Sequence, residues 1–223
     1  MHREHFSSQF DRELDEIRGK LLEMGGKVEL MITSAMQSLI ERDSELADRT
    51  ISVDQEIDRL EMEIDRKCLE VLALRQPAAR DLRFVTLALK IVTDLERIGD
   101  RCTSISRRVK ELNQEPSLKL SADLPLMAQA VAVMVQEALD AFVRCDEKLA
   151  SKVCEDDRMV DDLNVRIQLE LQAFMMLGPA IIGRAIRMNH VSRCLERIAD
   201  HATNVAEMVI FLVKGKDIRH AAA

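Results

Sequence analysis

The chain carries the same pattern of residues twice, and this duplication restricts its possible folds more than any other feature. Residues that return 100 positions later are Leu95, Glu96, Arg97, Ile98, Asp100 and Thr103. Residues that return 103 positions later are Asp43, Leu46, Ala47, Asp54, Asp58 and Leu60. A repeat of this length predicts two similar units of about 100 residues, each built from the same few elements.

The composition indicates that these elements are helices. Glycine and proline together number 11 of 223 residues, tryptophan and tyrosine do not occur, and there are six phenylalanines. Sandwiches and barrels need many tight turns, for which glycine and proline are the preferred residues. A hydrophobic content of 47% is too high for a disordered chain. The fold class is therefore predicted to be all-α, with a length sufficient to bury a core.

Apolar residues spaced three and four positions apart predict where the helices lie. One stripe runs from Phe6 to Leu39 and predicts a long first helix that ends near Arg42. Its phase continues across Gly25-Gly26, which favours a kink or a close helix contact over a loop. A second helix is expected to follow Asp43-Ser44 and to stop at Gln76-Pro77. A third is expected over residues 79–113.

The segment 115–125 is the expected linker, because it contains two prolines and two serines. The first three-helix repeat then covers residues 1–114 and the second covers residues 126–214. A frayed tail is expected over residues 215–223. Six helices in two tandem three-helix units account for the whole pattern.

Eight acidic residues form duplicated pairs with a spacing of four. They are Asp54, Asp58, Glu96, Asp100, Asp157, Asp161, Glu196 and Asp200. Residues four apart share a helix face, where like charges repel. Converging carboxylates suit hard cations with oxygen ligands, such as Mg, Mn, Ca or Fe. Zn is less favoured, because no His or Cys shares the face. The sequence predicts metal ions (Fe, Mn, Mg or Zn) at these eight residues.

Other interpretations of the same acids stay open. An acid pair on a solvated helix face is common, and Arg97 or Arg101 could neutralise these carboxylates. Helix-cap or first-turn positions also fit four aspartates: Asp54 and Asp157 of the eight, and Asp43 and Asp146 outside them. His201 follows Asp200 but lies on another helix face, so a bonded or solvated histidine is favoured over a ligand.

Several functional classes are excluded by what the chain lacks. A sequence pI near 5.4 argues against nucleic acid as a partner. There is no Gly-rich phosphate loop, nucleophile elbow or inward-facing Glu-x-x-His, so no catalytic set emerges. Five cysteines without a Cys-x-x-Cys pair indicate reduced thiols in the cytoplasm. We expect no signal peptide and no membrane insertion.

With these residues identified, the chain resembles the PhoU family of phosphate-transport regulators. The motifs that carry the resemblance are Ala79-Arg80-Asp81-Leu82-Arg83, Asp94-Leu95-Glu96-Arg97-Ile98-Gly99-Asp100 and Leu195-Glu196-Arg197-Ile198-Ala199-Asp200-His201-Ala202-Thr203-Asn204. The resemblance implies two three-helix bundles related by a pseudo-twofold axis. It also implies acid-x-x-x-Asp motifs that hold metal, and repression of phosphate-starvation genes when phosphate is plentiful.

The leading hypothesis is a non-enzymatic signalling adaptor that negatively regulates phosphate uptake. Proteins similar to this one act between the ATPase subunit of the phosphate transporter and a two-component histidine kinase, and often form homodimers. A metal-dependent enzyme or a metal store is the alternative, and loss of a turnover reaction on Asp100→Asn would favour it. A structural scaffold whose acids only solubilise the chain is the third possibility.

Overall fold

The computed structural model describes residues 2–118 and 121–215, with side chains described from residue 9 onward. It contains six helices and, over these residues, no strand. They are α1 (His2–Glu41), α2 (Ser44–Arg75), α3 (Ala79–Asn113), α4 (Asp123–Arg144), α5 (Glu147–Met175) and α6 (Pro179–Lys214). The all-α prediction is confirmed. Of the tail predicted over residues 215–223, Gly215 caps the end of α6, and the rest lies outside the described residues.

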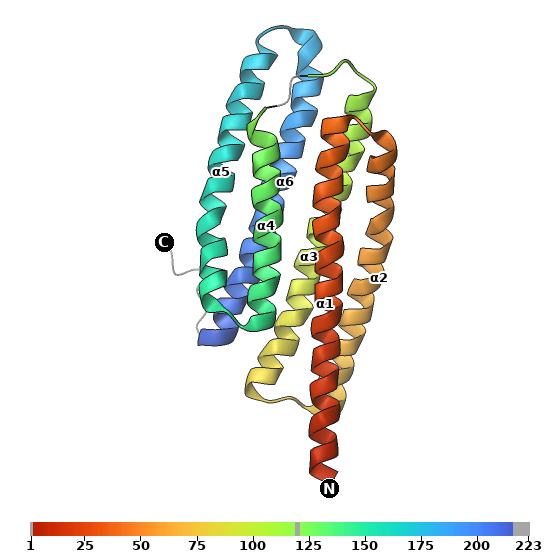
Figure 1. The fold of residues 1–223 in the computed structure, drawn as a ribbon, viewed down its shortest axis with the longest axis vertical. Coiled ribbons are helices and arrows are strands. Elements are labelled where there is room, and N and C mark those ends of the chain that lie inside the picture. The colour runs from red at the N-terminus through yellow and green to blue at the C-terminus, as the bar shows by residue number, and fades with distance from the viewer. Residues whose placement is uncertain (1, 119–120, 216–223) are drawn as a thin grey trace.

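The helices form an elongated bundle with two matching halves (Figure 1). Helices α1, α2 and α3 pack on one another, and α4, α5 and α6 do the same. The halves lie side by side and meet along two seams, one between α1 and α4 and the other between α3 and α6. Each seam pairs a helix with its own counterpart, as a pseudo-twofold axis requires. The prediction of two three-helix bundles is confirmed.

The seam between α1 and α4 is tight at one end. Helix α1 continues through Gly25, and a Cβ atom placed there would collide with the end of the Leu139 side chain on α4. Glycine lets the two backbones approach at this point. The close helix contact expected at Gly25-Gly26 is therefore present.

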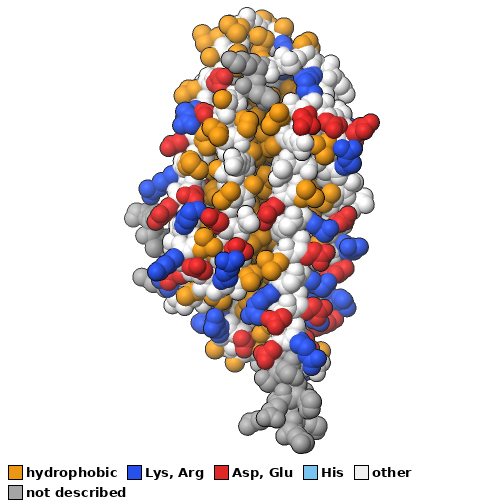
Figure 2. Space-filling view, viewed as in Figure 1, with side chains coloured by type: hydrophobic (Ala, Val, Ile, Leu, Met, Phe, Trp, Pro, Cys, Tyr) orange, Lys and Arg blue, Asp and Glu red, His pale blue; other side chains and the backbone are white. Residues whose placement is uncertain are grey.

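The same seam is open at its other end, at Ala128, which stands 103 positions after Gly25. A groove of about 430 Å³ runs there between α1 and α4. Its apolar lining includes Ile32, Met36, Ile40, Ala128 and Ala132. Figure 2 shows hydrophobic side chains along this line between the two helices. The two halves thus share a topology, but the two ends of the seam between them are packed differently.

Matching turns connect the first two helices of each half. Asp43 accepts hydrogen bonds from the backbone N–H groups of Glu45 and Leu46, and Asp146 does the same for Lys148 and Leu149. Both aspartates are N-caps, which satisfy N–H groups that have no partner within the helix. The cap interpretation therefore holds for Asp43 and Asp146.

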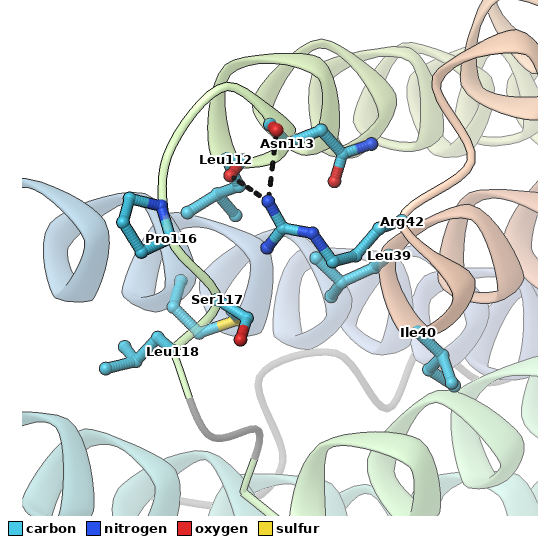
Figure 3. A pocket seen from close by; sticks show the side chains of 9 residues that line it. Leu39, Ile40, Arg42, Leu112, Asn113, Pro116, Ser117 and Leu118 are labelled. Carbon is cyan, nitrogen blue, oxygen red and sulfur yellow. Dashed lines mark hydrogen bonds between the residues drawn. The ribbon is translucent and has the colours of Figure 1, made fainter.

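Arg42 ties the turn after α1 to the end of α3 (Figure 3). Its backbone is left-handed, with φ 58°. Its guanidinium donates to the carbonyl oxygens of Leu112 at 3.1 Å, Asn113 at 3.0 Å and Glu115 at 2.6 Å. The last carbonyls of a helix have no partner within it, so Arg42 caps α3 from another element.

Helix α4 begins at Asp123, and Pro125 lies in its first turn, where proline is tolerated. Among the described residues, α4 is the one helix long and apolar enough to cross a membrane by length and composition. Half of its most apolar window is buried inside the bundle, as befits a core helix. Its hydrophobicity is accounted for by packing against α1, α5 and α6.

Candidate metal centres

The four predicted acids of the first half gather where α2 packs on α3. We call Asp54, Asp58, Glu96 and Asp100 the first acidic cluster. Burial raises the pKa of Asp54, and the nearby charges of Asp58 and Asp100 raise it further. Burial also raises the pKa of Glu96, followed by the charge of Asp100. The carboxylates of the two helices are therefore close enough to repel one another.

A fifth carboxylate, Glu61, joins this cluster and was not predicted. Burial raises its pKa, and the charges of Asp65, Asp58 and Asp100 add to the effect. Glu61 lies three residues after Asp58, on the same side of α2. That spacing was the signal that could have identified it.

The second half repeats the arrangement where α5 packs on α6. We call Asp157, Asp161, Glu196 and Asp200 the second acidic cluster. Burial and the charges of Asp161 and Asp200 raise the pKa of Asp157 from 3.8 to about 6. Burial and the Asp200 charge raise the pKa of Glu196. The structure therefore brings all eight predicted acids together in two groups of four.

Each cluster contains a threonine hydroxyl that is buried and forms no hydrogen bond. These are Thr103 on α3 and Thr203 on α6. Thr103 lies close to Asp54, and Thr203 lies close to Asp157. Each hydroxyl favours the ionised form of its neighbouring carboxylate. Neither hydroxyl meets the geometric criteria of a hydrogen bond. A buried hydroxyl without a partner is costly, and a small movement toward the aspartate, a water molecule or an ion would satisfy it.

Arginines compensate only some of these charges. Arg97 lies 3.5 Å from Glu96, while Arg197 lies 3.7 Å from Glu196 and 2.9 Å from Asp200. The acids without an ion pair within 4.0 Å in the described part of the chain are Asp54, Asp58, Asp100, Asp157 and Asp161. Local neutralisation by Arg97 therefore covers one acid of the first cluster.

The donor set fits a hard cation better than any other ligand. All donors are carboxylate or hydroxyl oxygens, several carboxylates lack a compensating charge, and each site has an unused buried hydroxyl. Within residues 9–118 and 121–215, however, no three His, Cys, Asp or Glu side chains converge closely enough to hold a metal ion as they are placed. Binding would require side-chain rotation, which the exposed Asp58 and Asp161 permit.

The two clusters differ beside their shared acids. Glu61 of the first half is replaced by Asn164 in the second. Asn164 is buried, and its Oδ1 accepts a hydrogen bond of 2.6 Å from Ser192, whose counterpart is Val92. The second half therefore has a neutral buried pair where the first has a carboxylate beside an apolar residue.

His201 is not part of either cluster. Its Nδ1 lies 2.8 Å from Asp94 Oδ1, across the seam between α3 and α6. The prediction of a bonded histidine is confirmed. All five cysteines are unpaired, as expected.

Comparison with known proteins places this geometry in context. The PhoU domain family model matches residues 21–109 and 124–209. The chain is 44% identical to the "phosphate-specific transport system accessory protein PhoU homolog" of Pseudomonas aeruginosa, over 97% of this chain and 90% of that protein. It is 35% identical to the corresponding Escherichia coli K12 protein, over 97% of this chain and 90% of that one.

Solved structures agree with this match. The crystal structure of PhoU from Pseudomonas aeruginosa superposes with a TM-score of 0.90 at 42% identity, covering 93% of this chain and 100% of that one. The "phosphate transport system regulatory protein PhoU" of Streptococcus pneumoniae gives a TM-score of 0.87 at 27% identity, covering 93% and 98%. The likeness spans both halves of the molecule.

Proposed function

The chain belongs to the PhoU family, and from this membership we propose that it is a non-enzymatic regulator of phosphate transport that represses uptake when phosphate is plentiful. The observation that carries the proposal is the match over 97% of the chain to proteins named as accessory to the phosphate-specific transport system. Its structural counterpart in Streptococcus pneumoniae is named as a regulatory protein.

The proposed adaptor acts in the cytoplasm, between the ATPase subunit of the phosphate transporter and a phosphate-sensing histidine kinase. It works there as a homodimer and also represses the phosphate-starvation genes. A rigid bundle of long helices suits this role, because it presents extended surfaces with fixed spacing to two partners at once.

Deletion of the coding sequence tests the regulatory role. In high phosphate, the deleted strain should express alkaline phosphatase at a high level, and a plasmid copy of the wild-type chain should restore repression. Normal repression in the deleted strain would rule the proposal out. Transporter and kinase levels measured in parallel separate a signalling defect from altered expression.

We further propose that each acidic cluster binds a hard metal ion, with Fe, Mn or Mg favoured over Zn. Support comes from the uncompensated carboxylates and the unpaired hydroxyls of Thr103 and Thr203. A bound cation would remove the repulsion between acids on neighbouring helices. It would thereby hold α2 against α3 and α5 against α6 more firmly.

Metal content measured by mass spectrometry tests the second proposal, on protein purified without a metal-affinity step. Wild type should carry about one ion or more per half, and Glu96→Gln/Asp100→Asn/Glu196→Gln/Asp200→Asn should lose it. The matched control is Glu155→Gln/Asp162→Asn, which neutralises two exposed acids of α5 outside the cluster. A wild type that stays metal-free after incubation with these cations would contradict the proposal.

A further inference from the structure

The pseudo-twofold axis passes through the seam between α3 and α6. The two sides of this seam are therefore equivalent and can be compared residue by residue. On one side, Asp94 of α3 accepts from Asn204 of α6 at 3.4 Å and bonds His201 at 2.8 Å. The residues at the same places on the other side, 100 positions away, are Cys194, Arg101 and Ser104. The carboxylate of one half is thus replaced by a thiol, while a histidine is replaced by an arginine.

The second side of the seam therefore has donors without the carboxylate. Ser104 Oγ lies 2.9 Å from His190 Nε2, across the seam. Burial raises the pKa of the Cys194 thiol, whereas the Ser104 hydroxyl and the Arg101 charge lower it. Ser104 and Arg101 therefore both lie beside this thiol. The Arg101 Nε atom is buried and forms no hydrogen bond. A buried guanidinium nitrogen without an acceptor is a position that an anion would satisfy.

The positive charge around this point exceeds the negative charge. Arg108 pairs with Glu111 at 2.7 Å, and Arg187 shares Glu111 at 2.9 Å. The pKa of His190 is lowered by burial first and then by the charges of Arg108 and Arg101, which outweigh the opposing Glu111.

An open pocket of about 360 Å³ lies beside His190. Its lining includes Arg108, Glu111, Arg187 and His190. Arg187 also reaches Glu115, at 2.8 Å. Arginine offers paired donors that match the geometry of phosphate oxygens.

We propose that this side of the seam, formed by Arg101, Ser104 and His190 with Arg108 nearby, binds a phosphate group. The bound group takes the role that the Asp94 carboxylate has on the other side. Its oxygens accept from Arg101 and Ser104, and its charge balances the surrounding arginines. This site is separate from the acidic clusters, and it stands whether or not those clusters bind metal.

Equilibrium dialysis of the full chain against labelled inorganic phosphate tests the site, with EDTA present to exclude phosphate held by metal. Wild type should bind about one phosphate per chain. Arg101→Gln should weaken binding at least tenfold, as expected for loss of a charge-assisted bond. Cys194→Asp should weaken it similarly, because it restores the carboxylate found at Asp94.

The matched control is Lys90→Gln, which changes the exposed residue at the place equivalent to His190 on the other side of the seam. It should bind phosphate as wild type does. Circular dichroism melts show whether each variant is folded. Competition with phenyl phosphate shows whether the natural ligand is the free ion or a phosphorylated molecule. If phenyl phosphate displaces the labelled phosphate at a lower concentration than unlabelled phosphate does, the ligand is a phosphorylated molecule. If it needs a higher concentration, the ligand is the free ion.

Two results would overturn the proposal. One is a folded wild type that binds no phosphate at millimolar concentration. The other is binding that Arg101→Gln and Cys194→Asp leave unchanged while both remain folded. Failure of the regulatory proposal would instead appear in the deletion strain, so the two can be told apart.

Discussion

The two acidic clusters occupy equivalent places in the two halves, yet their electrostatic surroundings differ. In the first, the Arg107 charge opposes the rise in the pKa of Asp54. The residue at the equivalent place in the second half is Glu207. There the pKa of Asp157 rises to about 6, even though Arg197 pairs with Asp200.

A duplicated motif therefore need not give duplicated chemistry. Both clusters keep the same four acids, but the second holds a carboxylate that is half protonated near pH 6. A proton would therefore compete with a bound cation at this cluster near pH 6. We expect metal binding at the second cluster to depend on pH more steeply than at the first.

Substitutions in the clusters should change metal affinity most, and separately at each cluster. Asp157→Asn/Asp200→Asn should lower Mn²⁺ affinity at the second cluster about 100-fold, because it removes two anionic ligands. Asp54→Asn/Asp100→Asn should do the same at the first, with each pair sparing the other cluster. Calorimetric titration counts the remaining sites. Loss of both sites from either variant would contradict two independent clusters, since it would show one shared centre.

A smaller effect is expected from the neutral pair of the second half. Ser192→Val should cost about 1–2 kcal/mol of unfolding free energy, because it leaves the buried Asn164 amide without its partner. Asn164→Glu/Ser192→Val recreates Glu61 and Val92 of the first half and should recover part of that loss. Urea denaturation measures both. A double variant less stable than Ser192→Val would show that the halves are not interchangeable here.

The change in unfolding free energy with pH, measured on metal-free protein, should differ by about 1 kcal/mol between variants of Asp157 and Asp54. The folded pKa of Asp157 lies above its ordinary value of 3.8, so the folded state binds the extra proton and stability falls as pH rises from about 4 to 6. The half-exposed position reduces the full linkage effect. In EDTA, Asp157→Asn should flatten this slope more than Asp54→Asn does. Equal slopes for the two variants would contradict the asymmetry.

The smallest difference is expected at the two N-caps. Asp43→Ala and Asp146→Ala should each cost about 1 kcal/mol of unfolding free energy, because each removes the acceptor of two backbone N–H groups. Thermal melts of both variants should coincide closely. A clear difference between the two melting temperatures would show that the halves differ at their turns as well as at their acidic clusters.

The helices were predictable because helical periodicity is a local signal. The second helix, for example, was expected after Asp43-Ser44 and up to Gln76, and α2 spans Ser44–Arg75. The grouping of the eight acids was predictable because a spacing of four places each pair on one helix face and the pairs recur in both halves. Glu61 was missed for the same reason, since its counterpart Asn164 is not an acid and the repeat does not mark it.

Contacts across the seams could not be predicted in this way. The bond between Asp94 and His201 depends on the register of two helices and joins residues 107 positions apart in the sequence. The anchoring of Arg42 on the end of α3 depends likewise on how a turn is placed against a distant helix. Periodicity fixes which face of a helix is apolar, but it does not fix which residue of another helix lies opposite.

The pairing of each seam helix with its own counterpart has a consequence for synthesis. Translation finishes α1 and α3 before α4 and α6 exist, so the faces that later meet them leave the ribosome uncovered. At ~5–20 residues per second, the remaining hundred or so residues take roughly 5–20 s to emerge. We therefore expect the nascent first half to expose apolar surface that chaperones can bind until its matching half covers it.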